Sequence, residues 1–281
     1  MKLKTLLYFI LVFCIQIVDA QLFIELYREG YPRSYLFGTM HLLPKNQFKV
    51  STNFKRYLDS SDLLVEELNL DALKGSKKLE LAKLTRLPQG KVLRDVLPDS
   101  VYRAMAFIFK NELKYSTFKW NALQQLHPLI LESLLLQHCV KKPLVPETYF
   151  YNYFKKKGKA CYGLETPQEQ MLLLTSLPVT LQFKEFPKTF SLVQSDYNNL
   201  LSMYQKEDLN ALYNYSTRFM PDSLNQALLF NRNRTWMQTL RVLLSQKSCF
   251  IAVGAAHLAG PQGLIELLKA EGFQIRLRDR E

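Results

Sequence analysis

Cysteine is scarce in this 281-residue chain, and its spacing excludes the common cysteine-based sites. One of the four cysteines lies in an apolar N-terminal run, and the other three are Cys139, Cys161 and Cys249. An odd number without a Cys-x-x-Cys pair indicates neither a disulfide framework nor a cysteine zinc site. A single disulfide among the three is left open. Cys161 and Cys249 lie in apolar runs that predict strands, where a cysteine is usually a small core residue.

Signature motifs of the commonest enzyme classes are also missing. The chain has no Gly-x-Ser-x-Gly nucleophile elbow, no Gly-x4-Gly-Lys-Ser/Thr phosphate loop and no His-Glu-x-x-His helix. It has no internal repeat of about 20 to 50 residues and no linker rich in Gly, Ser and Pro. These absences exclude a solenoid and favour one domain over residues 21–281.

Long apolar runs are limited to one, at the start of the chain. Lys2 and Lys4 precede an apolar stretch, Leu6–Val18, which ends in a small-residue exit site. This order is typical of a cleavable signal peptide, and the run is shorter than the about 20 residues of a transmembrane helix. We therefore expect residues 1–20 to be a signal peptide and the protein to be exported, periplasmic or secreted. An uncleaved anchor is the alternative.

Acidic residues are outnumbered by basic ones, 25 against 37, which gives a formal net charge of +12. A solvated basic surface is the simplest interpretation, and peripheral attraction to an anionic membrane or envelope polymer is the alternative. Nucleic acid is not an expected partner, because the chain carries an export signal and no recognition motif. Nothing in the sequence predicts an oligomeric state.

Short apolar segments at both ends and in the middle of the chain predict an α/β fold. The expected strands are Leu22–Tyr27, Ser34–Thr39, Asp62–Leu68, Lys159–Thr166, Ser248–Gly254 and Phe273–Leu277. Helical periodicity fills the segments between them, at greatest length over residues 71–137 and 167–246. We predict a mixed central β-sheet flanked by helices, an α/β (α+β) fold with a large helical insertion in a single domain.

Two of the four histidines occupy the same position after a predicted strand. His41 follows Gly38 by three residues, and His257 follows Gly254 in the same way. Ligands in α/β sheets gather beyond the carboxyl ends of strands, and glycine lets the backbone turn tightly there. We therefore expect both imidazoles to face one pocket. The other two histidines are interpreted as structural residues: His127 and His138.

Carboxylates lie at comparable places. Glu66 and Glu67 are neighbours in a predicted strand, so alternation lets at most one of them face the pocket, and Glu165 ends another strand. Two histidines with one or two carboxylates suit Zn, Mn, Co or another divalent ion, which activates water near neutral pH. The same groups could also act without metal, with a histidine as general base. A surface or salt-bridge role is the alternative for each glutamate alone.

An arginine pair lies inside a predicted helix. An arginine on the inner face of a helix is costly unless it meets a carboxylate or a developing anion. A surface position suffices for one of the pair, Arg232 or Arg234. Arg232 is therefore a candidate member of the pocket.

Five segments in order resemble the TraB/GumN family, which is related to the TIKI metalloproteases and more distantly to erythromycin esterase and ChaN-like proteins. The segments are Tyr35–Leu42, Val65–Leu68, Gly163–Gln170, Arg232–Trp236 and Val253–Leu264. The resemblance implies a mixed sheet flanked by helices and, in TIKI-like members, metal-dependent peptide cleavage. By this resemblance, the histidines of the family's paired Gly-x-x-His elements correspond to His41 and His257. The two family glutamates correspond to Glu67 and Glu165, and the helical arginine corresponds to Arg232.

Some positions depart from the family pattern. Asn69 stands where relatives often have Asp, Glu147 stands where Asp is expected, and His127-Pro128-Leu129 replaces a Pro-Trp pattern. None of these positions belongs to the set of residues expected in the pocket. The departures therefore concern its rim and the substrate.

These observations predict a metal-dependent hydrolase of the peptidase class that acts on a peptide or protein substrate. His41, His257 and Glu165 or Glu67 would hold a divalent ion, the remaining glutamate would act as general base, and Arg232 would stabilise the developing oxyanion. One alternative is a non-catalytic envelope protein that binds haem, metal or a small ligand in the same pocket. A metal-free esterase is the other.

Overall fold

The computed structural model describes residues 22–279 apart from 74–76, 180–182, 184, 185 and 219. The predicted signal peptide lies outside this part of the chain and stays a prediction. Within the described residues, no helix combines the length and apolar character that a bilayer crossing needs. The disulfide left open by the sequence is absent there, because Cys139, Cys161 and Cys249 are free thiols.

A mixed sheet of six strands, in the order β6-β4-β7-β2-β1-β8, forms the centre of the fold. The strands are β1 (Phe23–Tyr27), β2 (Ser34–Thr39), β4 (Leu63–Leu68), β6 (Ala160–Glu165), β7 (Cys249–Gly254) and β8 (Gln274–Leu277). The β6, β4, β7 and β2 strands run parallel, whereas β1 pairs antiparallel with both β2 and β8. The predicted mixed sheet is confirmed, each strand within two residues of its expected ends.

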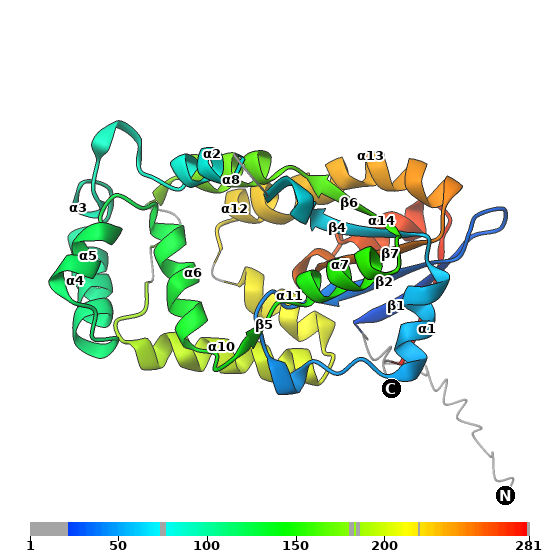
Figure 1. Ribbon diagram of the computed structural model, residues 1–281, viewed down its shortest axis with the longest axis horizontal. Coiled ribbons are helices and arrows are strands. Elements are labelled where there is room, and N and C mark those ends of the chain that lie inside the picture. Colours follow the sequence, from blue (N-terminus) through cyan, green and yellow to red (C-terminus); the bar gives the residue numbers. More distant parts are fainter. Residues whose placement is uncertain (1–21, 74–76, 180–182, 184–185, 219, 280–281) are drawn as a thin grey trace, which may run out of the picture.

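Helices cover both faces of this sheet (Figure 1). On one face, α1 (Thr52–Ser60) and α7 (Pro146–Lys156) pack through aromatic rings, among them Phe54 and Phe150 against Phe37 and Phe250 of the strands. On the other face lie α10 (Phe190–Gln205), α11 (Leu209–Thr217), α13 (Asn231–Gln246) and α14 (Leu264–Ala270). Because both faces are covered, β7 is buried along its whole length, which explains its continuous apolar sequence.

The predicted helical insertion forms a second apolar cluster at one end of the long axis of the molecule (Figure 1). Its helices include α3 (Leu93–Val96), α4 (Asp99–Phe107), α5 (Thr117–Leu123) and α6 (Pro128–His138). Between the insertion and the sheet lie α2 (Lys77–Leu84), α8 (Pro167–Ser176) and α12 (Asp222–Asn225). A second sheet, not predicted from the sequence, pairs β3 (Leu43–Pro44) with β5 (Pro143–Leu144).

Two histidines belong to the insertion and have structural contacts. His127 caps the start of α6, where its Nδ1 accepts a hydrogen bond from the amide of Leu129. His138, at the end of the same helix, contacts the hydroxyl of Tyr115 through Nε2. These contacts agree with the structural interpretation of both residues.

Candidate functional site

The carboxyl ends of β2, β7 and β4 lie at one edge of the sheet, because these neighbouring strands are parallel. Thr39 pairs with Gly254 at that edge. His41 follows β2, and His257 ends the short 3-10 turn that follows β7. The Nε2 atoms of His41 and His257 lie 3.9 Å and 4.0 Å from the same oxygen, Oε1 of Glu67. The matching Gly-x-x-His segments therefore bring both rings to one carboxylate.

Glu67 is buried at the centre of this group. Its Oε1 accepts a hydrogen bond from the amide of Gly254, at 2.8 Å, and its Oε2 accepts one from Nη2 of Arg232, at 2.7 Å. Burial raises the pKa of Glu67, but His257, His41, Arg232 and the Gly254 amide together lower it to about 2. The carboxylate is therefore charged near neutral pH, held among groups that favour the anion.

Gly254 leaves the space in which these groups meet. A Cβ atom at this position would stand 3.2 Å from Oε1 of Glu67 and 3.4 Å from Nε2 of His41. The backbone conformation of Gly254, with φ −52° and ψ 133°, is open to any residue. The glycine is thus needed here for space, and not for backbone freedom.

His257 is a buried, neutral ring with a defined tautomer. The side-chain amide of Asn233 donates to the carbonyls of His257 and Gln262, so its Oδ1 accepts from Nδ1 of His257, at 2.7 Å. The proton on Nδ1 leaves a lone pair on Nε2. Burial lowers the pKa of His257 to about 3. The negative charge of Glu67 opposes this shift, whereas the positive charge of Arg232 adds to it. The ring also packs on Trp236, with centroids 4.4 Å apart.

His41 is the open member of the group, with 64% of its side chain exposed. Its Nδ1 lies 2.7 Å from Oε1 of Glu147, which also accepts the hydroxyl of Thr39, and its Nε2 is directed to Glu67. Desolvation by neighbouring side chains lowers the pKa of His41, but the hydrogen bond to Glu147 and the charges of Glu147 and Glu67 outweigh this effect and raise the pKa to about 9. His41 is therefore cationic near neutral pH when nothing else binds Nε2.

Glu147 was missed as a site residue by sequence reasoning, which noted it only as a departure from the family pattern. It lies in the first turn of α7, and that helix brings it to His41 across 106 residues of chain. Asn233 was missed as well, although it lies beside the predicted Arg232. No local signal distinguishes Asn233, because α13 begins with a polar run, Asn231–Thr235.

Arg232 connects the acidic residues of the site. Its Nε and Nη2 donate to the two oxygens of Glu165, at 2.7 and 3.0 Å, and its Nη1 donates to Nε2 of His257, at 3.1 Å. The indole of Trp236 also donates to Glu165, at 2.8 Å. The carboxylate of Glu165 is thus directed to Arg232, and Arg234 is the exposed arginine of the pair. A π-helical turn, Gln226–Phe230, immediately precedes α13, and such turns are frequent at functional sites.

The donor set has the chemistry of a divalent-metal site but not the spacing of a bound one. Two imidazoles with Nε2 directed inward, each held at Nδ1 by a second residue, and one carboxylate are ligands typical of zinc. Among the residues that the structure describes, however, no three His, Cys, Asp or Glu side chains form a group close enough to hold an ion. Two donors that share a tetrahedral ion with bonds of about 2.0–2.2 Å lie roughly 3.4 Å apart. Each Nε2 atom, at 3.9 or 4.0 Å from Oε1 of Glu67, would therefore have to approach that oxygen by about half an ångström.

Glu66 lies on the other face of β4, as strand alternation predicts. Burial and the charge of Glu147 raise the pKa of Glu66 to about 9, so its carboxyl group is neutral near pH 7. No hydrogen bond joins it to the two histidines in the described part of the chain. Of the two adjacent glutamates, Glu67 alone faces the site.

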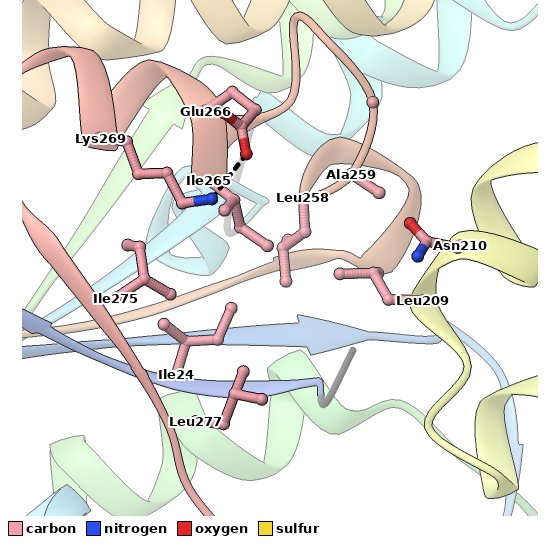
Figure 2. A pocket seen from close by; sticks show the side chains of 11 residues that line it. Ile24, Leu209, Asn210, Leu258, Ala259, Ile265, Glu266, Lys269, Ile275 and Leu277 are labelled. Carbon is pink, nitrogen blue, oxygen red and sulfur yellow. Dashed lines mark hydrogen bonds and ion pairs between the residues drawn. The ribbon is translucent and has the colours of Figure 1, made fainter. Parts of the chain in front are cut away.

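A separate cavity of about 240 Å³ lies between β1, β8 and α14 (Figure 2). Aliphatic side chains such as Ile24, Leu258 and Ile265 line it, and its charged groups, Glu266 and Lys269, pair with each other at 2.8 Å. Because it contains no histidine and no unpaired carboxylate, this cavity does not have the chemistry of the strand-end site.

Comparison with known proteins agrees with this geometry. A model of the TraB/PrgY/gumN family matches residues 23–277. The chain belongs to this family. This match confirms the predicted family. The matched residues include all six strands of the central sheet.

Curated relatives of this TraB/PrgY/gumN chain are named metalloproteases. It is 24% identical over 306 residues to a metalloprotease TIKI homolog of Amphimedon queenslandica, across 88% of this chain and 60% of the relative. It is 22% identical to metalloprotease TIKI2 of Danio rerio, across 87% and 58%, and 22% identical to metalloprotease TIKI1 of Homo sapiens, across 87% and 59%. The chain thus spans about three-fifths of the length of these relatives. No solved structure matches it.

Proposed function

We propose that this protein is a metal-dependent hydrolase that cleaves peptide bonds, with its site at His41, His257 and Glu67. One observation carries the proposal: both Nε2 atoms are directed to Oε1 of Glu67, at 3.9 and 4.0 Å. The names of the relatives, which are metalloproteases, support the same reaction class. The substrate is then a peptide or protein.

Three residues would hold the ion, through Nε2 of His41, Nε2 of His257 and Oε1 of Glu67. A bound Zn, Mn or Co ion would supply Lewis acidity to the scissile carbonyl and lower the pKa of water. Glu147 and Asn233 accept the Nδ1 protons and fix the orientation of each ring. These second partners leave the Nε2 atom of each ring directed into the site.

Arg232 supplies positive charge beside the reacting groups. Its guanidinium contacts Glu67 and is held from behind by both oxygens of Glu165. A fixed cation at this place stabilises the oxyanion that develops as a peptide carbonyl is attacked. We therefore assign Glu165, which the sequence offered as an alternative metal ligand, to the positioning of Arg232.

A metal-free hydrolase is the second candidate, and one observation favours it. Both oxygens of Glu67 and Nε2 of His257 already accept hydrogen bonds, from Arg232 and the Gly254 amide. In this reaction the carboxylate of Glu67 would accept the proton of water, and the imidazolium of His41 would orient the water. Activity that survives chelation would support this candidate over the metal-dependent one.

Export to the periplasm or the cell exterior belongs to the same proposal. It depends on the apolar run at residues 6–18, and the net charge of +12 would favour peripheral contact with an anionic membrane or envelope polymer. Fractionation of cells that produce the full chain, with N-terminal sequencing of the product, tests this. A product that begins at Gln21 outside the cytoplasm is expected, and an unprocessed cytoplasmic product contradicts it.

Cleavage of a peptide library by the purified protein tests the reaction. We expect cleavage that a chelator abolishes, that Zn, Mn or Co restores, and that His257→Ala or Glu67→Gln removes. His138→Ala is the control, because this exposed histidine lies in the helical insertion. Cleavage that is unaffected by chelator and by both site variants contradicts the proposal.

A further inference from the structure

Arg232 donates a hydrogen bond to Nε2 of His257, the atom through which this histidine would bind a metal ion. The proton of His257 is on Nδ1, where Asn233 accepts it, so Nε2 has a single lone pair to offer. That lone pair accepts the Nη1–H of Arg232, at 3.1 Å. A lone pair that accepts a hydrogen bond cannot bind a cation at the same time, so the two interactions exclude each other.

We infer that Arg232 and a divalent cation compete for Nε2 of His257, and that metal binding requires the guanidinium to withdraw toward Glu165. The inference rests on the metal site proposed above and adds how that site is regulated. Repulsion between the guanidinium and a cation acts in the same direction as the shared lone pair. Arg232 is then a resident cation that neutralises the site in the metal-free protein.

Glu165 can still bind Arg232 after the arginine has withdrawn from His257. Its two oxygens accept Nε and Nη2 of Arg232, an edge of the guanidinium that does not contact His257. This bidentate pair is geometrically specific and can persist after Nη1 is released. Trp236 donates to Glu165 as well, at 2.8 Å, so the carboxylate stays in position. Arg232 can therefore leave His257 without becoming an unpaired buried charge.

Metal affinity of Arg232→Gln tests the competition directly. Isothermal titration of the purified full chain with Zn²⁺, and separately with Mn²⁺, gives the dissociation constants. Removing the arginine frees the lone pair and removes a charge-assisted hydrogen bond, so we expect binding tighter by about tenfold or more than in the unsubstituted protein. Equal or weaker binding by the variant overturns the inference.

Two further variants keep the result interpretable. Arg234→Gln is the matched control, because this exposed arginine on the same helix contacts Gln262 and not the histidines, and its metal affinity should equal that of the unsubstituted protein. If Arg232→Gln fails to fold without metal, the double variant Arg232→Gln/Glu165→Gln removes the cation and its carboxylate together. Tighter binding is expected there too, and equal or weaker binding overturns the inference.

The inference and the proposed function fail in different ways. Tighter metal binding by Arg232→Gln, in a protein that cleaves no peptide, supports the competition and contradicts the hydrolase. Metal-dependent cleavage with unchanged metal affinity in Arg232→Gln supports the hydrolase and overturns the competition. Absence of metal binding by Arg232→Gln and by the double variant overturns both the competition and the metal-dependent site.

Discussion

Nδ1 of His41 lies 2.7 Å from Oε1 of Glu147, so a residue at the end of β2 is oriented by one at the start of α7. This carboxylate directs Nε2 of the exposed ring toward Glu67. A carboxylate that holds the far nitrogen of a histidine raises the basicity of the ring and fixes its direction. His41 and His257 therefore reach the same carboxylate from different environments, one open and ion-paired, the other buried and neutral.

Glu147→Gln should lower the pKa of His41 from about 9 toward its ordinary value of 6.5, because the variant removes the charge that stabilises the imidazolium. Ring-proton NMR titration of the metal-free protein measures this pKa. Glu169→Gln, a first-turn glutamate of α8 that bonds Thr166, is the control. An unchanged titration of His41 in Glu147→Gln contradicts the assigned pair.

Stability should fall on both sides of about pH 6.5 because the two site histidines titrate in opposite directions. The pKa of His41 is raised to about 9, so its contribution is fully present below 6.5 and is lost as the pH rises through 9. The pKa of His257 is lowered to about 3, so its contribution is present above 6.5 and is lost as the pH falls through 3. Solvent screening reduces the alkaline effect, since His41 is exposed.

Urea unfolding from pH 4 to pH 10 measures this dependence. His41→Gln should reduce the decline above about pH 6.5, and the rest of that decline comes from Glu66, whose raised pKa of about 9 also destabilises the fold as the pH rises. His257→Gln should reduce the decline below about pH 6.5. The two variants act as controls for each other. If each variant changes stability by the same amount at every pH, the assigned directions are wrong.

Gly254→Ala should preserve the fold and impair the reaction. The backbone conformation tolerates alanine, but the new methyl group would stand 3.2 Å from Glu67 Oε1 and 3.4 Å from His41 Nε2. Contacts this tight require Glu67 or His41 to move by a few tenths of an ångström. We therefore expect a measurable loss of peptide cleavage that is smaller than the cost of a displacement of about 1 Å, which is on the order of 100-fold. Thermal unfolding within a few degrees of the unsubstituted protein is the companion measurement. Full activity in this variant would show that the reaction occurs elsewhere.

Asn233→Ala should weaken both stability and metal affinity. The variant removes the acceptor of the buried His257 Nδ1 and the donor to two carbonyls, a buried one at His257 and a partly buried one at Gln262. Unpaired buried polar groups cost about 1–3 kcal/mol of unfolding free energy, and loss of a second partner costs about 10–100-fold in metal affinity. Urea unfolding and zinc titration measure the two effects. Unchanged zinc affinity would separate Asn233 from the metal site.

Much of the sheet and part of the site could be predicted from local sequence. Apolar runs bounded by glycine and polar residues located the six strands, and the repeated Gly-x-x-His segments located His41 and His257 at strand ends. Alternation along β4 separated Glu66 from Glu67 because side chains of a strand face opposite sides. These are properties of a few neighbouring residues, which is why they could be read without the fold.

The contacts that tune the site depend on long-range packing. Glu147 reaches His41 because α7 packs on the sheet, and Glu165 meets Arg232 because α13 lies beside the end of β6. The short pairing of β3 with β5 joins segments 100 residues apart and has no periodic signal of its own. The spacing of residues in the sequence could identify charged residues of the site, but it could not predict which of them form ion pairs.

Anomalous diffraction locates the metal ion in the protein. Crystals of the protein grown with zinc would be measured at the zinc absorption edge, and the anomalous difference map gives the ion's position. We expect a peak about 2.0–2.2 Å from Nε2 of His41, from Nε2 of His257 and from a Glu67 oxygen, with Arg232 withdrawn from His257. A map without a peak there, in crystals whose Arg232 still donates to Nε2 of His257, would contradict it.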